Sequence, residues 1–113
     1  MPDHIKIREA TGTWVVRASG AVLGESSNAL ELTEGSSAPV IYFPREDIGM
    51  SFLEQTDSTT RCPHKGTASY FTVSGPDGDL IDAAWSYETP HEAMAPIAGH
   101  LAFYADRVTV EKL

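Results

Sequence analysis

The sequence has 113 residues, and its 42% apolar and 21% charged side chains are the balance of one globular domain spanning 1–113. That balance excludes a disordered chain, a collagen and a coiled coil. Sixteen acidic against eight basic residues give a net charge of −8. This charge excludes a free-standing nucleic-acid binder, because phosphate contacts need a basic face.

Short runs of strand-forming residues, separated by turn signals, fill the first half of the chain. The runs lie at 5–10, 13–18, 21–25, 29–33, 39–43 and 51–55. Ser19-Gly20 predicts a tight turn between the second and third runs. Pro44 at the first helical position predicts one helical turn over 44–48.

The second half continues in the same way. Its strand signals lie at 67–73, 80–87, 101–104 and 107–111. Residues 74–79 predict a turn, 90–98 with two prolines predict a loop or a short helical turn, and the last two strands predict a hairpin around Ala105-Asp106. Without a long amphipathic helix, the chain is predicted to be all-β, either a barrel or two packed antiparallel sheets of short strands, with one or two short helical turns.

The beginning of the chain and its cysteine content predict a cytoplasmic protein. Residues 1–8 lack the apolar stretch of a secretion signal, and no run reaches the ~20 apolar residues of a membrane span. Cys62 is the only cysteine, so no disulfide can form within the chain. A lone thiol is typical of a reducing compartment.

The first candidate site is the segment 42–47, which reads Tyr-Phe-Pro-Arg-Glu-Asp. Arg45 follows a predicted buried strand, and a guanidinium there can donate two parallel hydrogen bonds to a carboxylate or phosphate. We therefore treat Arg45 and its neighbour Glu46 as candidate ligand-binding residues. The alternative is a surface ion pair between Arg45 and Asp47 or another acid.

The second candidate site is the segment 60–66, which reads Thr-Arg-Cys-Pro-His-Lys-Gly. Cys62 lies beside Arg61, His64 and Lys65, and nearby positive charge favours the thiolate. Cys62 is thus a candidate nucleophile, and Lys65 is a candidate catalytic residue or anion ligand. The alternative is a buried, inert thiol. Gly66 permits a positive φ and a close approach of the backbone.

The third candidate site is the segment 82–87, which reads Asp-Ala-Ala-Trp-Ser-Tyr. Strand alternation puts Trp85 and Tyr87 on one face and Asp82 on the other. Two small alanines leave space beside the aromatic walls, so the segment predicts a ligand slot. The alternative is a packed core with the aromatic rings at its rim. Asp82 is expected to pair with Arg45 or Lys65, or else to face water.

No metal or cofactor is predicted. The candidate metal ligands are His4, His64, His91, His100 and Cys62, and none of them stand in Cys-x-x-Cys or His-x-x-x-His spacing. The sequence also lacks a glycine-rich phosphate-binding motif and the Gly-x-Ser-x-Gly of a serine hydrolase.

Taken together, these segments resemble the small bacterial and fungal domain-of-unknown-function family number 427, sometimes labelled nucleotidyltransferase-like. The matching stretches are 42–47, 60–66, 82–87 with Pro90, and 97–104. The resemblance implies a β-tent fold, two antiparallel sheets leaning together, as in methionine sulfoxide reductase B and certain zinc-binding exchange factors. The paired Cys-x-x-Cys motifs of those proteins are missing here, so their zinc is not carried over.

The resemblance implies no established activity. The sequence shows no acidic arrangement for Mg²⁺ of the kind that nucleotidyl transfer needs. What the resemblance adds is a reason to group its pattern residues, which are Arg45, Cys62, Lys65, Trp85 and Tyr87, in one pocket.

Three functions follow as hypotheses. The first is a module that binds a small anionic or planar metabolite, with Arg45 and Lys65 on the anionic group and Trp85 and Tyr87 on the planar part. The second is an enzyme that uses Cys62 as a thiolate nucleophile or redox group, with Glu46 or Asp82 handling protons. The third is a structural or partner-binding domain. The expected partner is an unidentified small molecule, with no nucleic acid and no membrane, in a monomer or homodimer.

Overall fold

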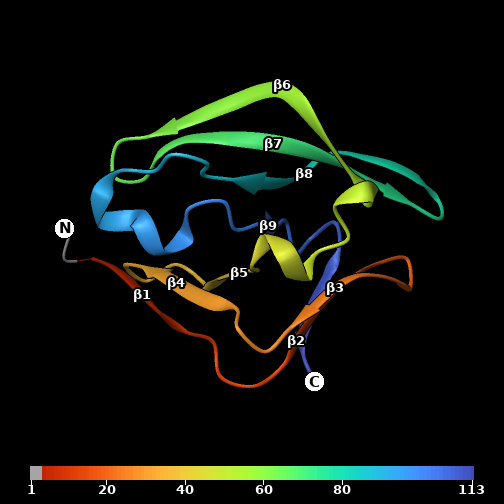
Figure 1. The fold of residues 1–113 in the computed structure, drawn as a ribbon, viewed down its shortest axis with the longest axis horizontal. Helices are drawn as coiled ribbons and strands as arrows, with labels where there is room; N and C mark the ends of the chain where they lie inside the picture. Colours follow the sequence, from red (N-terminus) through yellow and green to blue (C-terminus); the bar gives the residue numbers. More distant parts are fainter. Residues whose placement is uncertain (1–3) are drawn as a thin grey trace.

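The computed structural model describes residues 4–113, which form ten β-strands and three short 3₁₀ helices (Figure 1). The strands are β1 (Ile5–Glu9), β2 (Trp14–Ala18), β3 (Ala21–Ser26), β4 (Leu30–Glu34), β5 (Val40–Tyr42), β6 (Leu53–Cys62), β7 (Gly66–Gly75), β8 (Gly78–Ser86), β9 (Ala102–Phe103) and β10 (Thr109–Lys112). The helices are η1 (Arg45–Asp47), η2 (Met50–Phe52) and η3 (Glu92–Ile97).

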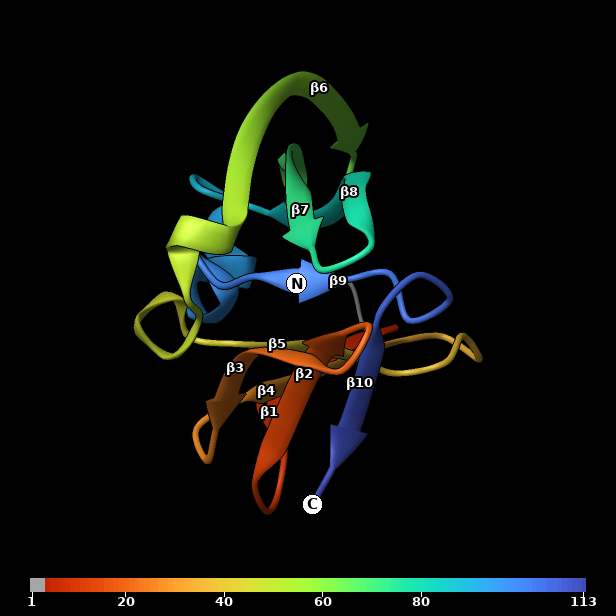
Figure 2. The same ribbon diagram turned by 90° about the vertical axis from the view of Figure 1, so that its right-hand side faces the viewer.

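The strands are grouped in three antiparallel sheets, with the orders β1-β4-β5, β10-β2-β3 and β6-β7-β8-β9. The four-stranded sheet covers one side of the molecule, and the two three-stranded sheets form the other side (Figures 1 and 2). β9 runs between the two sides (Figure 2). The predicted all-β fold of packed antiparallel sheets is confirmed, with the strands divided among three sheets.

The two sides meet at an isolated bridge between Phe43, just after β5, and Leu101, just before β9. Their backbone N–H and C=O groups exchange two hydrogen bonds of 2.8 and 2.9 Å. No sheet pairs β5 with β9, so the Phe43–Leu101 bridge stands alone and is not part of a ladder.

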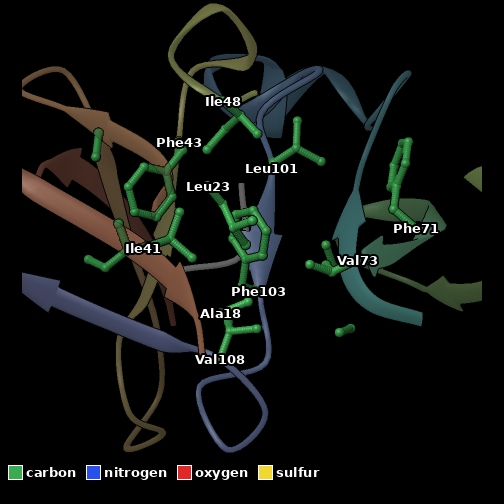
Figure 3. Packing of buried hydrophobic residues seen from close by; sticks show 14 of the residues in the cluster. Ala18, Leu23, Ile41, Phe43, Ile48, Phe71, Val73, Leu101, Phe103 and Val108 are labelled. Atoms are coloured by element: carbon green, nitrogen blue, oxygen red, sulfur yellow. The ribbon is translucent and has the colours of Figure 1, made fainter. Parts of the chain in front are cut away.

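Buried apolar side chains form two clusters. The first, which we call the phenylalanine core, fills the space between the sheets (Figure 3) and contains no tyrosine. Its largest members are Phe43, Phe71, Phe103, Leu23, Leu101, Ile41 and Ile48. The second, the tyrosine cluster, contains Tyr42 and Tyr87 with Ile5, Leu32, Ala68, Met94, Ile97 and Ala102, and no phenylalanine. Tyr42 and Phe43 are consecutive, and strand alternation sends them to different clusters.

Several sequence predictions of local structure are confirmed. Ser19 and Gly20, both at positive φ, form the tight turn between β2 and β3. Residues 76–77 turn between Gly75 and Gly78, which pair at the ends of β7 and β8. The predicted helical turns over 44–48 and 90–98 contain η1 and η3.

The predicted closing hairpin is wrong. β9 pairs with β8 and β10 pairs with β2, so the two strands belong to different sheets. The turn between them, in which the N–H groups of Arg107 and Val108 both bond to the carbonyl of Tyr104, carries the chain from one side of the molecule to the other. An apolar pattern marks the buried face of a strand but not its partner, which explains the error.

The strand predicted at 51–55 has different bounds. Its first two residues belong to η2, and β6 continues to Cys62. Residues 56–61 are polar and mostly exposed, so the sequence has no alternating apolar pattern there. The pairing with β7 keeps this stretch extended.

Candidate functional site

A hollow of about 210 Å³ opens beside the tyrosine cluster. All four tyrosines of the chain line it, namely Tyr42, Tyr70, Tyr87 and Tyr104. We call this feature the tyrosine hollow. The rest of its lining is Trp85, Lys65, Glu34, Leu32, Ser37, Ala38 and Val40.

The aromatic lining comes from four strands or their ends. Tyr70 in β7 stands opposite Trp85 in β8, and Tyr87 follows two residues after Trp85. Trp85 and Tyr87 line the same hollow, as alternation along the strand predicts. Tyr42 ends β5, and Tyr104 directly follows β9. The hollow thus lies where both sides of the molecule contribute residues.

Lys65 is held in place by the tight turn that joins β6 to β7. Cys62 and Gly66 pair across this turn, and Gly66 has a φ of +114°, a conformation that glycine adopts without strain. The carbonyl of Lys65 accepts a hydrogen bond of 3.1 Å from the N–H of His91. A Cβ on Gly66 would also lie 3.4 Å from the Cα of Pro90, so the turn packs closely against this segment.

The rings of the hollow are fixed by contacts among themselves. The indole N–H of Trp85 donates a 3.2 Å hydrogen bond to the hydroxyl of Tyr42, and the two rings meet edge to face. On its other side Trp85 lies against Tyr104, with ring centroids 4.6 Å apart and planes tilted by 46°. The hydroxyls of Tyr70 and Tyr104 are 3.5 Å apart, and that of Tyr70 is 2.9 Å from the Thr60 hydroxyl. The aromatic wall is therefore preorganised.

One ion pair lies at the polar end of the hollow. Lys65 Nζ donates a 2.7 Å hydrogen bond to Glu34 Oε1, and the Lys65 side chain is only 12% exposed. The exposed ring of His4 stands 3.6 Å from the other Glu34 oxygen. The hydrogen bond from Lys65 is the main reason that the pKa of Glu34 is lowered. The charge of Lys65 is thus already balanced by a protein carboxylate.

The hydroxyls of Tyr42, Tyr87 and Tyr104 stay protonated at neutral pH. Burial raises the pKa of Tyr42 to about 12 and also raises the pKa of Tyr87. The hydrogen bond to Tyr70, followed by burial, raises the pKa of Tyr104 to about 12. These hydroxyls therefore act as neutral hydrogen-bonding groups around the hollow.

The structure divides the predicted site residues. Lys65, Trp85 and Tyr87 share the tyrosine hollow, whereas Arg45, Glu46 and Asp82 are not part of its lining. Arg45 Nη1 donates to Glu88 at 3.0 Å and to the carbonyl of Gly99 at 3.1 Å. Its guanidinium also lies 5.6 Å from the centre of the Phe71 ring. Arg45 thus forms an ion pair with Glu88. An ion pair with an acid was the alternative that the sequence left open to ligand binding by Arg45.

The other two acidic residues lie apart from the hollow. Glu46 is exposed on η1. Asp82 accepts hydrogen bonds of 2.7 Å from the hydroxyls of Thr56 and Ser58 on β6, rather than pairing with Arg45 or Lys65. These two hydrogen bonds, that from Ser58 foremost, lower the pKa of Asp82. Asp82 also has a φ of +54°, at the point where the pairing of β7 and β8 shifts register.

Cys62 ends β6 as a half-buried free thiol that packs against the tyrosine cluster. It is not among the residues that line the tyrosine hollow, and its role as a nucleophile stays a prediction. Between residues 4 and 113, no group of three or more His, Cys, Asp or Glu side chains is placed to hold a metal ion.

The predicted site residues do not include Tyr42, Tyr70, Tyr104 or Glu34. The signal for the tyrosines was their chemistry, because a buried tyrosine needs a partner or solvent for its hydroxyl whereas a phenylalanine does not. Glu34 carried no comparable signal. It meets Lys65 only because the end of β4 lies against the β6–β7 turn.

Comparison with known proteins identifies a family. The family model that matches the chain covers residues 6–112 and is described as a domain of unknown function, DUF427. No curated protein matches the chain. In the part of the chain that the structure describes, no helix is long and apolar enough to cross a membrane.

Proposed function

This chain belongs to the DUF427 family, and we propose that it is a binding module for a small planar molecule. The ring of that molecule lies among the aromatic side chains of the tyrosine hollow. A hydrogen-bond acceptor on its edge faces Lys65. The observation that carries the proposal is the convergence of all four tyrosines and Trp85 on one hollow.

The choice of aromatic residues supports binding rather than packing. Three of the four phenylalanines, Phe43, Phe71 and Phe103, lie in the phenylalanine core, while every tyrosine lines the hollow. An aromatic ring with a polar tip suits a surface that contacts a ligand on one side and water on the other. Tyr104, at 38% exposure, keeps much of its ring uncovered.

The charges in the hollow favour a neutral planar ligand over an anionic one. Lys65 already bonds to Glu34, so an incoming anion would have to compete with a protein carboxylate for the same ammonium group. The ammonium group has three N–H donors, of which Glu34 takes one. A neutral acceptor such as a carbonyl oxygen can use another donor without disturbing the pair.

Benzamide is a suitable first probe, because it combines a planar ring with a carbonyl acceptor. Titration followed by isothermal calorimetry or protein NMR is expected to show binding at the tyrosine hollow. Cyclohexanecarboxamide, which has the same acceptor on a puckered ring, is expected to bind at least tenfold more weakly, a loss of about 1.4 kcal/mol. Benzoate is expected to gain little over benzamide despite its charge.

Matched variants locate the binding. Tyr104→Ala and Lys65→Met are each expected to weaken benzamide binding about tenfold, equivalent to about 1.4 kcal/mol. Phe52→Ala removes an aromatic ring of similar exposure, 40% against 38%, outside the hollow and is expected to leave binding unchanged. Arg17→Met is the control for Lys65→Met, because it removes a cation that is paired with Glu111 outside the hollow. It is also expected to leave binding unchanged. Equal binding of the planar and puckered amides, or equal losses in the control variants, would contradict the proposal.

A further inference from the structure

A second, larger hollow of about 540 Å³ lies beside the tyrosine hollow. Residues of β4, β5, β8 and β9 line it, and so do Trp14 and Val110 from the β10-β2-β3 sheet. We call it the apolar hollow. Its lining is Trp14, Glu31, Ala38, Pro39, Val40, Ile41, Trp85, Phe103, Tyr104, Ala105 and Val110.

The two hollows share a wall. Ala38, Val40, Trp85 and Tyr104 line both of them. Trp85 is held by its hydrogen bond to Tyr42, and its ring lies against that of Tyr104. The two hollows therefore adjoin at these side chains.

The hollows differ in polarity. The tyrosine hollow contains the Lys65–Glu34 pair and the tyrosine hydroxyls. In the apolar hollow Glu31 is the one charged lining residue, and its carboxylate accepts a 2.7 Å hydrogen bond from Arg8. Nothing else in the lining of the apolar hollow carries a charge, so this end suits hydrocarbon.

The sizes also point to one ligand across both hollows. A volume of about 210 Å³ lies below the roughly 300–1,000 Å³ of ordinary ligand pockets, whereas about 540 Å³ lies within that range. The tyrosine hollow is thus large enough for one ring but small for a whole metabolite. The adjoining apolar hollow supplies the missing volume.

We infer that the ligand is a linear amphiphile, with a planar polar head and an unbranched hydrocarbon tail. The head lies in the tyrosine hollow with its acceptor toward Lys65, and the tail crosses the shared wall of Val40, Trp85 and Tyr104 into the apolar hollow. This inference rests on the proposed function, since it places the head in the same site. The ligand is taken up as a free molecule from water.

A series of 4-alkylbenzamides tests the inference, because the head stays constant while the tail grows. Affinities of benzamide and its methyl, butyl and hexyl derivatives are measured by isothermal calorimetry, below the concentrations at which the probes aggregate. Each added methylene is expected to tighten binding about fourfold, as for hydrocarbon leaving water. Phosphatidylcholine vesicles that carry the hexyl derivative form a separate arm, in which the free probe is expected to bind better than the vesicle-bound one.

Ala105→Trp blocks the apolar hollow at an exposed position, so the fold is expected to tolerate it. In this variant the butyl and hexyl derivatives are expected to lose their advantage while benzamide binds as before. Ala95→Trp adds the same side chain at an exposed position on η3, outside both hollows, and is expected to keep the full advantage.

The outcomes separate this inference from the proposed function. If benzamide binds and the tail adds nothing, or if Ala105→Trp keeps the advantage of the long tails, the amphiphile is overturned while the planar-ligand proposal stands. Binding to the vesicle-bound probe alone also overturns it. If no member of the series binds, both fail together.

Discussion

The phenylalanine core and the tyrosine cluster share two of the three sheets but differ in how much of their aromatic rings they expose. In the phenylalanine core, Phe43 and Phe103 meet edge to face with centroids 6.0 Å apart, and at most 5% of either residue is exposed. Beside the tyrosine cluster, the ring centroids of Trp85 and Tyr104 are 4.6 Å apart, and Tyr104 is 38% exposed. The first pair closes a core, whereas the second forms the wall of an opening.

The difference shows that alternation along a strand can separate two tasks within a few residues. Phe43 faces a sealed space of hydrocarbon, which stabilises the fold by about 1.5–3 kcal/mol for each large side chain removed from water. Tyr42, its neighbour, keeps a hydroxyl that accepts the Trp85 N–H and fixes the wall of the hollow. Stability therefore depends chiefly on the phenylalanine core, whereas the proposed binding of a planar ring depends on the tyrosine hollow.

The largest expected effect tests this division directly. Phe43→Ala leaves a cavity in the phenylalanine core, where the residue is 0% exposed, and is expected to lower the free energy of unfolding by about 3–5 kcal/mol. Tyr104→Ala at the wall of the hollow is expected to cost only about 1 kcal/mol, as most substitutions of partly exposed residues do. Urea denaturation of both variants measures the two values. Losses of similar size would mean that the wall is as structural as the core.

A smaller effect is expected from the hydroxyl of Tyr42. Tyr42→Phe leaves the indole N–H of Trp85 without its acceptor, and we expect a loss of about 1–2 kcal/mol. The reverse exchange next to it, Phe43→Tyr, puts an unpartnered hydroxyl into the sealed core and is expected to cost at least as much. Urea denaturation at pH 7 compares the two. If Tyr42→Phe had the same free energy of unfolding as the wild type, the hydroxyl would not be what holds Trp85 in the wall of the hollow.

The same residue predicts a change in alkaline stability. In the folded protein the pKa of Tyr42 is raised from 10.0 to about 12, so the unfolded chain ionises first and stability is lost as pH rises through that window. Tyr42→Phe removes this contribution, and its stability is expected to fall less steeply between pH 10 and 12 than that of the wild type. Tyrosinate absorbance during the titration shows whether one late-ionising group has been removed.

The fold class could be read from the sequence because its signals are local. Alternating runs and the turns at Ser19-Gly20 and 76–77 are local patterns, and the structure contains them. The partner of β10 could not be read, because a short strand with one buried face is compatible with several neighbours. The polar second half of β6 had no pattern at all.

The candidate site could be read only in part for a related reason. Trp85 and Tyr87 stand two residues apart at the end of β8, so the alternation of the strand predicts that they share a face. Arg45 instead binds Glu88 and the carbonyl of Gly99, which lie 43 and 54 residues after it in the sequence. Contacts over such separations depend on how the sheets cross, and residue type alone does not encode this.

The smallest expected effect is that of Lys65→Met on stability, and its dependence on pH distinguishes the tyrosine hollow from the phenylalanine core. Lys65→Met keeps the aliphatic stem and removes the cation, and we expect a loss of about 1 kcal/mol at pH 7 because Glu34 is partly exposed. In the wild type Lys65 holds the pKa of Glu34 below 4.5, so the stability that comes from the pair is present above pH 4.5 and is lost as pH falls through the lowered value.

The difference between wild type and Lys65→Met is therefore expected to shrink as the pH falls below 4.5, in urea denaturation at several pH values. The more exposed Arg17–Glu111 pair is the control, and Arg17→Met is expected to cost less than about 0.5 kcal/mol. Phe43→Ala should cost the same at every pH at which the protein stays folded, because no charge is involved. If the stability lost in Lys65→Met were equally independent of pH, Lys65 would contribute through packing rather than through its charge. The polar end of the hollow would then resemble the phenylalanine core.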